Sequence, residues 1–199
     1  MVALKTLTIA LLGNPNTGKS TLFNALTGLR QHVGNWPGKT VEKAEGFAHL
    51  PDGRRIRVVD LPGTYALHAE SPEERIACEF LLSGEVDAVI IVVDATNLAR
   101  NLYLVLQALE LTDKVVVALN MMDEAKAKGL QVDTRRLSAL LGVPVVPMVA
   151  VKGEGVTEAL QTAMAVAEGV TSTHPVKPRY GLLVETCVQK LLPHIQRVA

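Results

Sequence analysis

The stretch Gly13-Asn-Pro-Asn-Thr-Gly-Lys-Ser20 decides the fold of this chain. It follows a nearly continuous apolar run at residues 7–12, typical of a buried strand, and precedes a predicted helix over residues 18–29. The pattern G-x-x-x-x-G-K-S in that context predicts a phosphate-binding loop, because backbone N–H groups and the helix N-terminus converge on phosphate oxygens. In such a loop Lys19 reaches the β- and γ-phosphates, and the Ser20 hydroxyl is a ligand of Mg²⁺.

Beyond this loop, short apolar runs alternate with helical patterns, which is typical of an α/β sheet. The predicted strands cover residues 7–12, 41–50, 54–59, 88–93, 115–119 and 145–149. The predicted helices cover residues 18–29, 73–82, 100–109, 134–141 and 156–167. Pro51-Asp52-Gly53 is a turn signal that favours an antiparallel hairpin. The sequence thus predicts a mostly parallel six-stranded sheet with one antiparallel strand, flanked by about five helices.

The composition predicts a soluble globular domain with a full hydrophobic core. The chain has 199 residues, 48% of them hydrophobic, with 20 Lys+Arg against 20 Asp+Glu. Zero net charge argues against a nucleic-acid partner, and no apolar run approaches the roughly 20 residues that span a bilayer. Cys78 and Cys187 are expected to be thiols in a reducing cytosol, although the sequence also allows one disulfide.

The C-terminal segment differs in character from the rest of the chain. Residues 171–178 contain Ser, Thr and two prolines, which favours a linker. Beyond it, Leu183, Cys187, Leu191 and Ile195 recur at roughly helical spacing. We expect a nucleotide-binding domain over 1–169, a linker over 170–179 and a partial helical appendage over 180–199. That helix either begins a further domain or docks on the first one.

Three further sequence motifs indicate that the base of the bound nucleotide is guanine. Asp60-Leu-Pro-Gly63 supplies a carboxylate that can hold Mg²⁺ through water and a Gly63 N–H that can sense the γ-phosphate. In Asn120-Met-Met-Asp123, the Asp123 carboxylate can accept hydrogen bonds from the N1–H and the amino group of guanine, a pair that adenine lacks. Ala150-Val-Lys152 offers a backbone N–H for the guanine O6. All three follow predicted strands, where open α/β sheets bind their ligands.

In their order, these motifs resemble the G1, G3, G4 and G5 elements of small GTPases of the Era/TrmE-like branch. More narrowly, three segments resemble the N-terminal G domain of the ferrous-iron transport protein B (FeoB) family. They are Gly34-Asn-Trp-Pro-Gly-Lys-Thr-Val-Glu42, Asp60-Leu-Pro-Gly-Thr-Tyr65 and Ala95-Thr-Asn-Leu-Ala-Arg-Asn-Leu-Tyr-Leu104. The Gly-Asn-Trp-Pro-Gly segment is the specific part, since generic GTPases lack it. The resemblance extends over residues 7–167 and implies a three-layer P-loop GTPase fold.

The resemblance also implies residue roles. Thr40 is the switch I threonine that closes onto Mg²⁺ and the γ-phosphate, and Asn16 helps to hold a K⁺ ion beside the phosphates, with backbone carbonyls near Gly34 and Trp36 as further ligands. The residues expected to act in hydrolysis are Asn16, Lys19, Thr40 and Gly63. The expected nucleotide contacts are Gly13, Asn14, Asn16, Thr17, Gly18, Lys19, Ser20, Thr21, Asn120, Met121, Asp123, Ala150, Val151 and Lys152. The expected metal ligands are Ser20, Thr40 and Asp60 for Mg²⁺, and Asn16, Gly34 and Trp36 for K⁺.

Three positions depart from the common GTPase pattern. Thr64 stands where Ras-like enzymes place the glutamine that orients the attacking water, so slow intrinsic hydrolysis is expected. Met121 replaces the lysine of N-K-x-D, which removes a stem that packs over the base, so modest nucleotide affinity and fast release are expected. Ala150 lacks the usual serine hydroxyl, so only its backbone is expected to meet the base. Trp36, the sole tryptophan, is either an exposed switch residue or a core anchor.

The function implied by the resemblance is a Mg²⁺-dependent GTPase, stimulated by K⁺, that serves as the cytosolic switch of a prokaryotic ferrous-iron transporter. Its partners would be GTP and GDP, the membrane permease domain of the same protein, small cytosolic accessory proteins and further copies of itself. It would lie at the cytoplasmic face of the inner membrane. Two alternatives remain: a nucleotide-dependent regulatory binding module with negligible turnover, which Thr64 favours, and a GTPase for ribosome or tRNA maturation.

Overall fold

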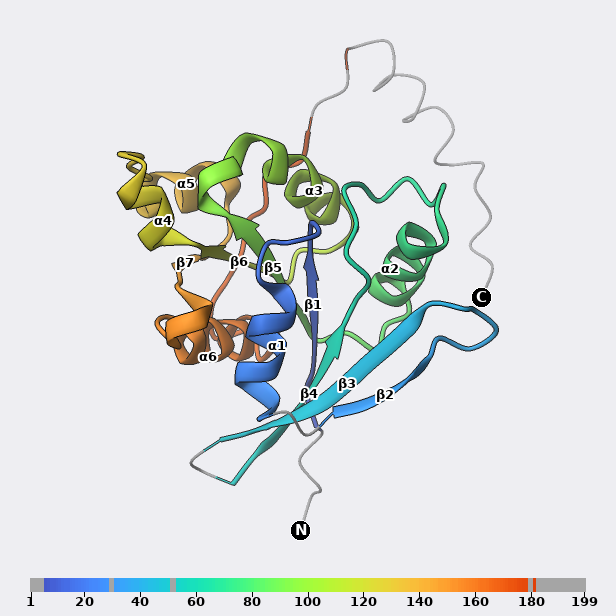
Figure 1. The fold of residues 1–199 in the computed structure, drawn as a ribbon. Helices are drawn as coiled ribbons and strands as arrows, with labels where there is room; N and C mark the ends of the chain where they lie inside the picture. The colour runs from blue at the N-terminus through green and yellow to red at the C-terminus, as the bar shows by residue number, and fades with distance from the viewer. Residues whose placement is uncertain (1–5, 29–30, 51–52, 179–180, 182–199) are drawn as a thin grey trace.

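A seven-stranded sheet forms the centre of the molecule, in the strand order β2-β3-β4-β1-β5-β6-β7 (Figure 1). The computed structural model describes residues 6–28, 31–50, 53–178 and 181. The strands are β1 (Thr8–Gly13), β2 (Gln31–Asn35), β3 (Glu42–His49), β4 (Arg55–Asp60), β5 (Ala88–Asp94), β6 (Val115–Asn120) and β7 (Val145–Pro147). The α-helices are α1 (Lys19–Thr27), α2 (Pro72–Leu82), α3 (Leu98–Leu111), α4 (Met122–Ala127), α5 (Thr134–Leu141) and α6 (Val156–Ala167). Short 3₁₀ turns at Ala95–Asn97 and Ala150–Lys152 complete the described elements.

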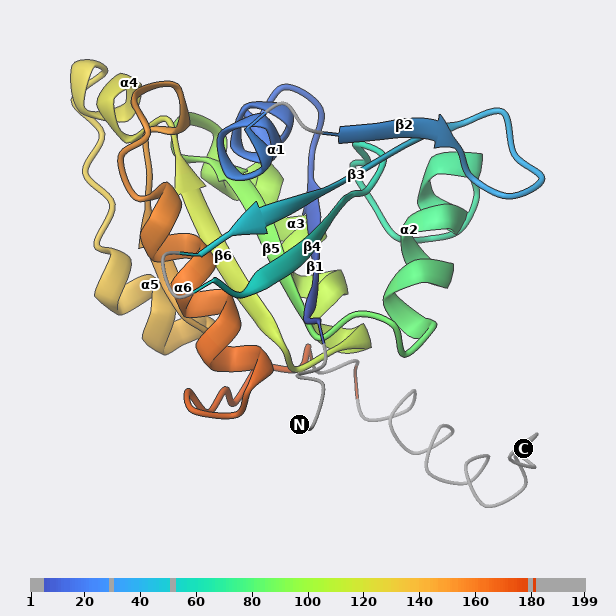
Figure 2. The same ribbon diagram turned by 90° about the horizontal axis from the view of Figure 1, so that it is seen from below.

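Helices cover both faces of the sheet and give three layers (Figures 1 and 2). Successive residues of β1 point to opposite faces, so Ala10 and Leu12 join one core while Ile9 and Leu11 join the other. The first core contains side chains of α2, α3 and α5, and the second contains side chains of α1 and α6. The predicted three-layer α/β fold with a mostly parallel sheet is confirmed.

Two elements were missed by the sequence prediction. The sheet has seven strands rather than six, because β2 was not predicted, and the described residues contain a sixth α-helix, α4. The β2 sequence QHVGN is polar and contains glycine, and it pairs only with β3 at the edge of the sheet. The α4 helix has only six residues, too few for a helical period to stand out.

The direction of the strands brings four polar chain segments to one edge of the sheet. β3 runs antiparallel to both of its neighbours, whereas β4, β1, β5, β6 and β7 are mutually parallel. In register, Leu11 of β1 pairs with Asp60, and Asp94 of β5 pairs with Asn120. The carboxyl ends of β1, β4, β5 and β6 therefore meet at one edge, the usual place for a ligand in such a sheet.

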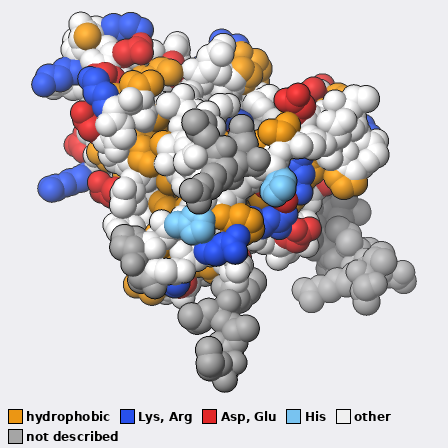
Figure 3. Space-filling view, turned by 60° about the horizontal axis from the view of Figure 1, so that its bottom comes forward, with side chains coloured by type: hydrophobic (Ala, Val, Ile, Leu, Met, Phe, Trp, Pro, Cys, Tyr) orange, Lys and Arg blue, Asp and Glu red, His pale blue; other side chains and the backbone are white. Residues whose placement is uncertain are grey.

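The surface of the described residues mixes both signs of charge. On the face shown in Figure 3, Lys and Arg side chains alternate with Asp and Glu side chains, and the described residues there form no continuous basic patch. This agrees with the balanced composition of the chain. Within the described ranges, no helix has the length and apolar character needed to cross a membrane.

The predicted linker lies as a strap, residues 171–178, against the end of α5. The backbone N–H groups of His174 and Val176 donate to the carbonyls of Gly142 and Leu141, at 2.8 and 2.9 Å. Lys177 forms an ion pair of 2.7 Å with Asp113 on the turn before β6. Residues 182–199, which carry Cys187 and the predicted C-terminal helix, lie outside the described residues.

Gly142 is the residue on which the strap depends. It ends α5 with φ 72°, and a Cβ built there would lie 1.8 Å from the His174 carbonyl oxygen. We expect Gly142→Ala to lower the free energy of unfolding by about 2–4 kcal/mol, through left-handed strain plus the clash. Gly129→Ala is a matched control, with the same φ of 72° and no described atom within 4 Å of its added Cβ. If urea denaturation gave the same decrease in the free energy of unfolding for both variants, the contact between Gly142 and the strap would not contribute to stability.

Candidate nucleotide-binding site

A cavity of about 540 Å³ opens where the β1–α1 loop faces the carboxyl ends of β4 and β6. Its size is typical of a small-molecule site. Its lining residues are Asn14, Pro15, Asn16, Gly18, Lys19, Ser20, Thr21, Gly63 and Met121. All of them except Pro15 were predicted from the sequence as nucleotide or catalytic residues, so the structure brings these predicted residues together at one cavity.

The backbone of the loop is tightly turned. Asn16 and Gly18 have φ values of 65° and 86°, and the Thr17 hydroxyl donates to the Asn14 carbonyl at 2.9 Å. A Cβ at Gly13 would lie 2.7 Å from the Val92 carbonyl oxygen, so glycine is needed where the loop leaves β1. No side chain of the described residues caps the N-terminus of α1, so its first N–H groups are available to a phosphate.

Lys19, which lines the cavity, is paired with Asp60. The buried Lys19 ammonium forms an ion pair with the Asp60 carboxylate, which ends β4. Burial raises the pKa of Asp60 above its ordinary value, and the charge of Lys19 and its hydrogen bond oppose that rise. The carboxylate and the exposed Ser20 hydroxyl are hard oxygen donors, the kind that Mg²⁺ prefers, so these residues fit a Mg²⁺ ion.

Asn120 joins the phosphate-binding loop to the 150–152 turn. Its Nδ2 donates to the Thr17 carbonyl at 2.8 Å, and its Oδ1 accepts from the Ala150 N–H at 2.9 Å. The side chain is buried, and a Cβ on Gly18 would lie 2.2 Å from Nδ2. Both polar ends of Asn120 are therefore engaged inside the protein, and in this structure its role is to position the two loops.

Asp123 lies in the first turn of α4, two residues after Met121, which lines the cavity. Its Oδ2 forms an ion pair of 2.7 Å with the Lys152 ammonium, and both side chains are partly exposed. The hydrogen bond from Lys152 holds the pKa of Asp123 below its ordinary value. The carboxylate is thus ionised at neutral pH and can accept hydrogen bonds from a base. The neighbouring Val151 is exposed, and Met121, with φ 62°, lines the cavity.

Three predicted metal-site residues lie on the β2–β3 hairpin instead. Gly34 is in β2, paired with Lys43, and Thr40 is exposed in the turn. Trp36 is buried, with its ring in an edge-to-face contact with Phe80, so of the two interpretations of this tryptophan the core anchor is confirmed. Residues 31–41 contribute none of the described residues that line the cavity. In this structure the predicted K⁺ ligands Gly34 and Trp36 and the predicted Mg²⁺ ligand Thr40 are not at the site.

A second, smaller cavity of about 190 Å³ lies beside the phosphate-binding loop. No role was predicted from the sequence for most of the residues that line it. Asp94, at the end of β5, accepts from the Thr96 N–H and the Asn97 amide at 2.7 and 2.9 Å. The signal was available, because Asp94 follows its strand just as Asp60 and Asn120 follow theirs. Its lining residues are Asn14, Pro15, Asn16, Thr17, Tyr65, Asp94, Asn97, Arg100 and Asn101.

In the segment after β4, the Thr64 hydroxyl is not free to orient water. Thr64 is buried, and its hydroxyl donates to the Ala66 carbonyl at 2.8 Å. Its backbone N–H donates to the Gly13 carbonyl at 3.2 Å, which ties this segment to the phosphate-binding loop. The next side chain, Tyr65, is half-exposed with the Arg100 guanidinium 4.4 Å from its ring centre.

Comparison with known proteins places this geometry in a family. The family model described as Ferrous iron transport protein B matches residues 7–163. The chain belongs to the FeoB family. The Fe(2+) transporter FeoB of Escherichia coli (strain K12) is 50% identical over an alignment of 182 residues, with coverage of 88% of this chain and 23% of that protein. The chain therefore spans about a quarter of the length of the curated FeoB relatives that it matches.

Solved FeoB structures share the fold. The cytosolic domain of T. maritima FeoB in apo form is 42% identical, with a TM-score of 0.89 and coverage of 98% of this chain and 76% of that one. An S. thermophilus NFeoB mutant bound to GDP is 40% identical, with a TM-score of 0.87 and coverage of 96% and 73%. The seven-stranded architecture described above is thus that of the FeoB G domain.

Proposed function

We propose that this FeoB-family chain is a Mg²⁺-dependent GTP hydrolase that serves as the nucleotide switch of a ferrous-iron transporter. The observation that carries the proposal is the Asn120 bridge, which fixes the phosphate-binding loop and the 150–152 turn in one frame. A nucleotide with its phosphates at Lys19 would then present its base to Asp123. Support for guanine comes from the ionised Asp123 carboxylate and from the S. thermophilus relative bound to GDP.

In this proposal Lys19 and Ser20 bind the phosphates and Mg²⁺, and Asp60 holds the metal through water. The Gly63 N–H senses the γ-phosphate, and the cation charges stabilise the negative charge that develops during transfer. Arrival of a phosphate and a metal would separate the Lys19–Asp60 ion pair, since each partner gains an opposite charge. Thr40 would have to move from the hairpin to the site to complete the Mg²⁺ shell.

Potassium stimulation is part of the same proposal. Asn16 lines the cavity and its side chain is exposed, so it is available to a cation beside the phosphates. Its backbone is in the left-handed region. A K⁺ ion bound there would add positive charge where no arginine or glutamine of the described residues lines the 540 Å³ cavity.

Iron transport belongs to the whole protein in this proposal, because the chain covers only a quarter of its transporter relatives. Residues 1–169 form the switch, 170–179 the linker and 180–199 the start of a helical domain. The permease domain would follow in cis and hold the chain at the cytoplasmic face of the cell membrane. Small accessory proteins and further copies of the chain are the remaining proposed partners.

A second candidate, a regulatory binding module with negligible turnover, is favoured by Thr64. The position that would orient the attacking water is buried, and its hydroxyl is bonded to the Ala66 carbonyl. Such a module would bind GTP and GDP and signal through loop ordering without hydrolysis.

Calorimetric titration of GDP and ADP into the chain tests the binding part of the proposal. With Mg²⁺ present, we expect GDP to bind at least roughly a hundredfold more tightly than ADP, because adenine cannot satisfy Asp123. Chelation of Mg²⁺ should weaken GDP binding, since Ser20 and Asp60 would lose the metal that links them to the phosphates. Equal affinities for GDP and ADP would refute the assignment of guanine.

A further inference from the structure

Trp36 fastens the β2–β3 hairpin to helix α2. Its ring meets the Phe80 ring edge-to-face, with centroids 5.2 Å apart and an interplanar angle of 70°, and the Lys43 ammonium lies 5.2 Å from its ring centre. Only 8% of Trp36 is exposed, although Pro37 and Gly38 beside it are exposed. Trp36 thus anchors a turn whose other residues are exposed or half-buried, with Val41 at its end packing against the same core.

The same turn carries Thr40. The Trp36 N–H donates to the Val41 carbonyl at 3.0 Å, and the Trp36 carbonyl accepts from the Lys39 N–H at 2.9 Å. Only three residues separate Trp36 from Thr40, and these bonds close the turn around them. While Trp36 stays against Phe80, Thr40 is held on the hairpin and away from the residues that line the nucleotide cavity.

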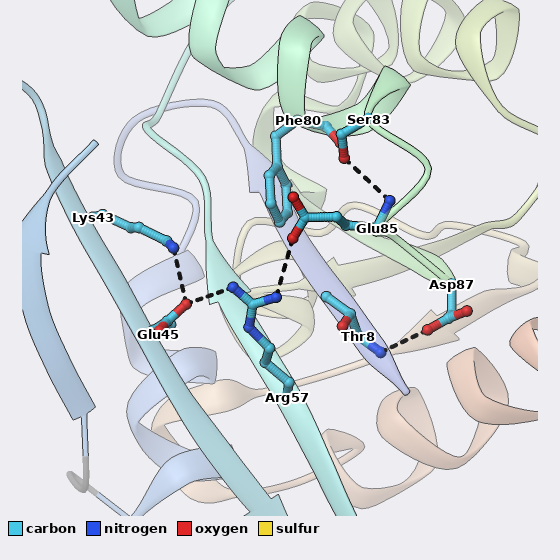
Figure 4. A network of polar contacts seen from close by, with 8 residues as sticks. All are labelled: Thr8, Lys43, Glu45, Arg57, Phe80, Ser83, Glu85 and Asp87. Carbon is cyan, nitrogen blue, oxygen red and sulfur yellow. Dashed lines mark hydrogen bonds and ion pairs between the residues drawn. The ribbon is translucent and has the colours of Figure 1, made fainter. Parts of the chain in front are cut away.

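The strand beneath the turn is fixed separately by an ion network (Figure 4). Glu45 of β3 pairs with Lys43 at 3.0 Å and with Arg57 of β4 at 2.7 Å, and Arg57 reaches Glu85 after α2 at 3.3 Å. The hydrogen bond from Arg57 is the main reason that the pKa of Glu45 lies below its ordinary value. The network ties β3 to β4 and to the segment after α2, and it includes no residue of the turn at residues 36–41.

The buried position of Trp36 leaves one of its polar atoms unpaired and a space beside its ring unfilled. The Trp36 Nε1 is buried without a hydrogen-bond partner in the part of the chain that the structure describes. A buried unpaired donor opposes the anchored state, because water would satisfy that N–H once the ring is released. The space beside the ring is not filled either, since a cavity of about 280 Å³ is bounded there by Trp36, Lys39, Ile76 and Phe80. Contacts of the ring with Phe80 and with the Lys43 ammonium, and no hydrogen bond of Nε1 to a described residue, therefore hold the indole in place.

We propose that Trp36 is a latch, and Phe80 its seat, that holds Thr40 away from the nucleotide and opposes the GTP-bound state. Phe80 is then a positioning residue, acting on the site only through Trp36 and Thr40. This inference rests on the proposed function, because only a γ-phosphate with Mg²⁺ would draw Thr40 from the hairpin. A switch in which part of the GTP binding energy opens a latch binds GTP more weakly than its contacts alone would allow.

The sole tryptophan makes the latch directly observable. We expect a non-hydrolysable GTP analogue with Mg²⁺ to shift Trp36 emission to longer wavelength and to increase its quenching by acrylamide, with no such change on GDP binding. Calorimetry on the same samples reports binding independently. Binding of both nucleotides without a change in emission would refute the latch alone, and failure of both to bind would refute the proposed function and the latch with it.

The variant Phe80→Leu weakens the seat while keeping an apolar side chain in the core. We expect the affinity for the GTP analogue to rise roughly three- to tenfold, the worth of an aromatic pair, while the affinity for GDP stays the same. Phe47→Leu, on the same hairpin but outside the latch, should change neither affinity. Equal changes for GDP and the analogue in Phe80→Leu would indicate a general structural effect and overturn the proposal.

Discussion

Replacing Asn120 by alanine should weaken GDP binding by roughly a hundredfold or more and lower the free energy of unfolding by about 2–4 kcal/mol. The substitution leaves the Thr17 carbonyl and the Ala150 N–H without the partners that they have in the structure. Each is a buried polar group, so each loses the free energy of a hydrogen bond and remains poorly solvated. The phosphate-binding loop and the 150–152 turn, which we propose bind the phosphates and the base, are then no longer fixed relative to each other.

Calorimetry with GDP and urea denaturation measure these two effects separately. Asn24→Ala, a half-buried asparagine on α1 that does not line the cavity, is the matched control and should alter unfolding by no more than about 0.5 kcal/mol. If Asn120→Ala lost stability but kept its GDP affinity, Asn120 would serve the fold alone, and the bridge could not be the observation that supports nucleotide binding.

Asp123→Asn should change which base the site accepts. The carboxamide offers an N–H where guanine also presents donors, so GDP affinity should fall by roughly a hundredfold or more. Xanthine carries a carbonyl oxygen in place of the guanine amino group, and that oxygen can accept from the new carboxamide. Xanthosine diphosphate should therefore bind the variant more tightly than GDP does, which reverses the order expected for the wild type.

The side chain of Asp123 is partly exposed and its partner Lys152 is at the surface, so the variant should fold as the wild type does. Glu124→Gln removes a neighbouring exposed carboxylate and serves as the control, with both affinities unchanged. Competition titrations with GDP and xanthosine diphosphate make the measurement. Equal weakening of the two nucleotides by Asp123→Asn would mean that Asp123 does not read the base.

The strand, loop and helix around residues 13–20 could be predicted because each signal there is local. An apolar run, glycines at two sharp turns and a helical period are all visible within about 20 residues. The β2 strand could not be predicted, because its polar residues pair with β3 only once the edge of the sheet exists. Strand formation there is a property of the partner strand rather than of the five residues themselves.

In the candidate site, too, local motifs could be predicted from the sequence, whereas contacts between distant residues could not. The spacing of Asn120 and Asp123 predicted a base-binding motif, but the bond from Asn120 to Thr17 joins residues 103 positions apart and appears only in the folded chain. Trp36 remained ambiguous for a similar reason. Its glycine and proline neighbours predict an exposed turn, whereas its burial depends on Phe80 of α2, which lies far along the sequence.

Steady-state phosphate release from GTP tests the central claim, that this site hydrolyses GTP, most directly. The assay compares matched KCl and NaCl buffers, each with Mg²⁺, and uses ATP as the control substrate. The account predicts phosphate release from GTP but not from ATP, and several-fold faster release in KCl because of the K⁺ ion that we propose binds at Asn16. Equal and barely detectable rates in both salts would contradict it and leave the chain as a regulatory nucleotide-binding module.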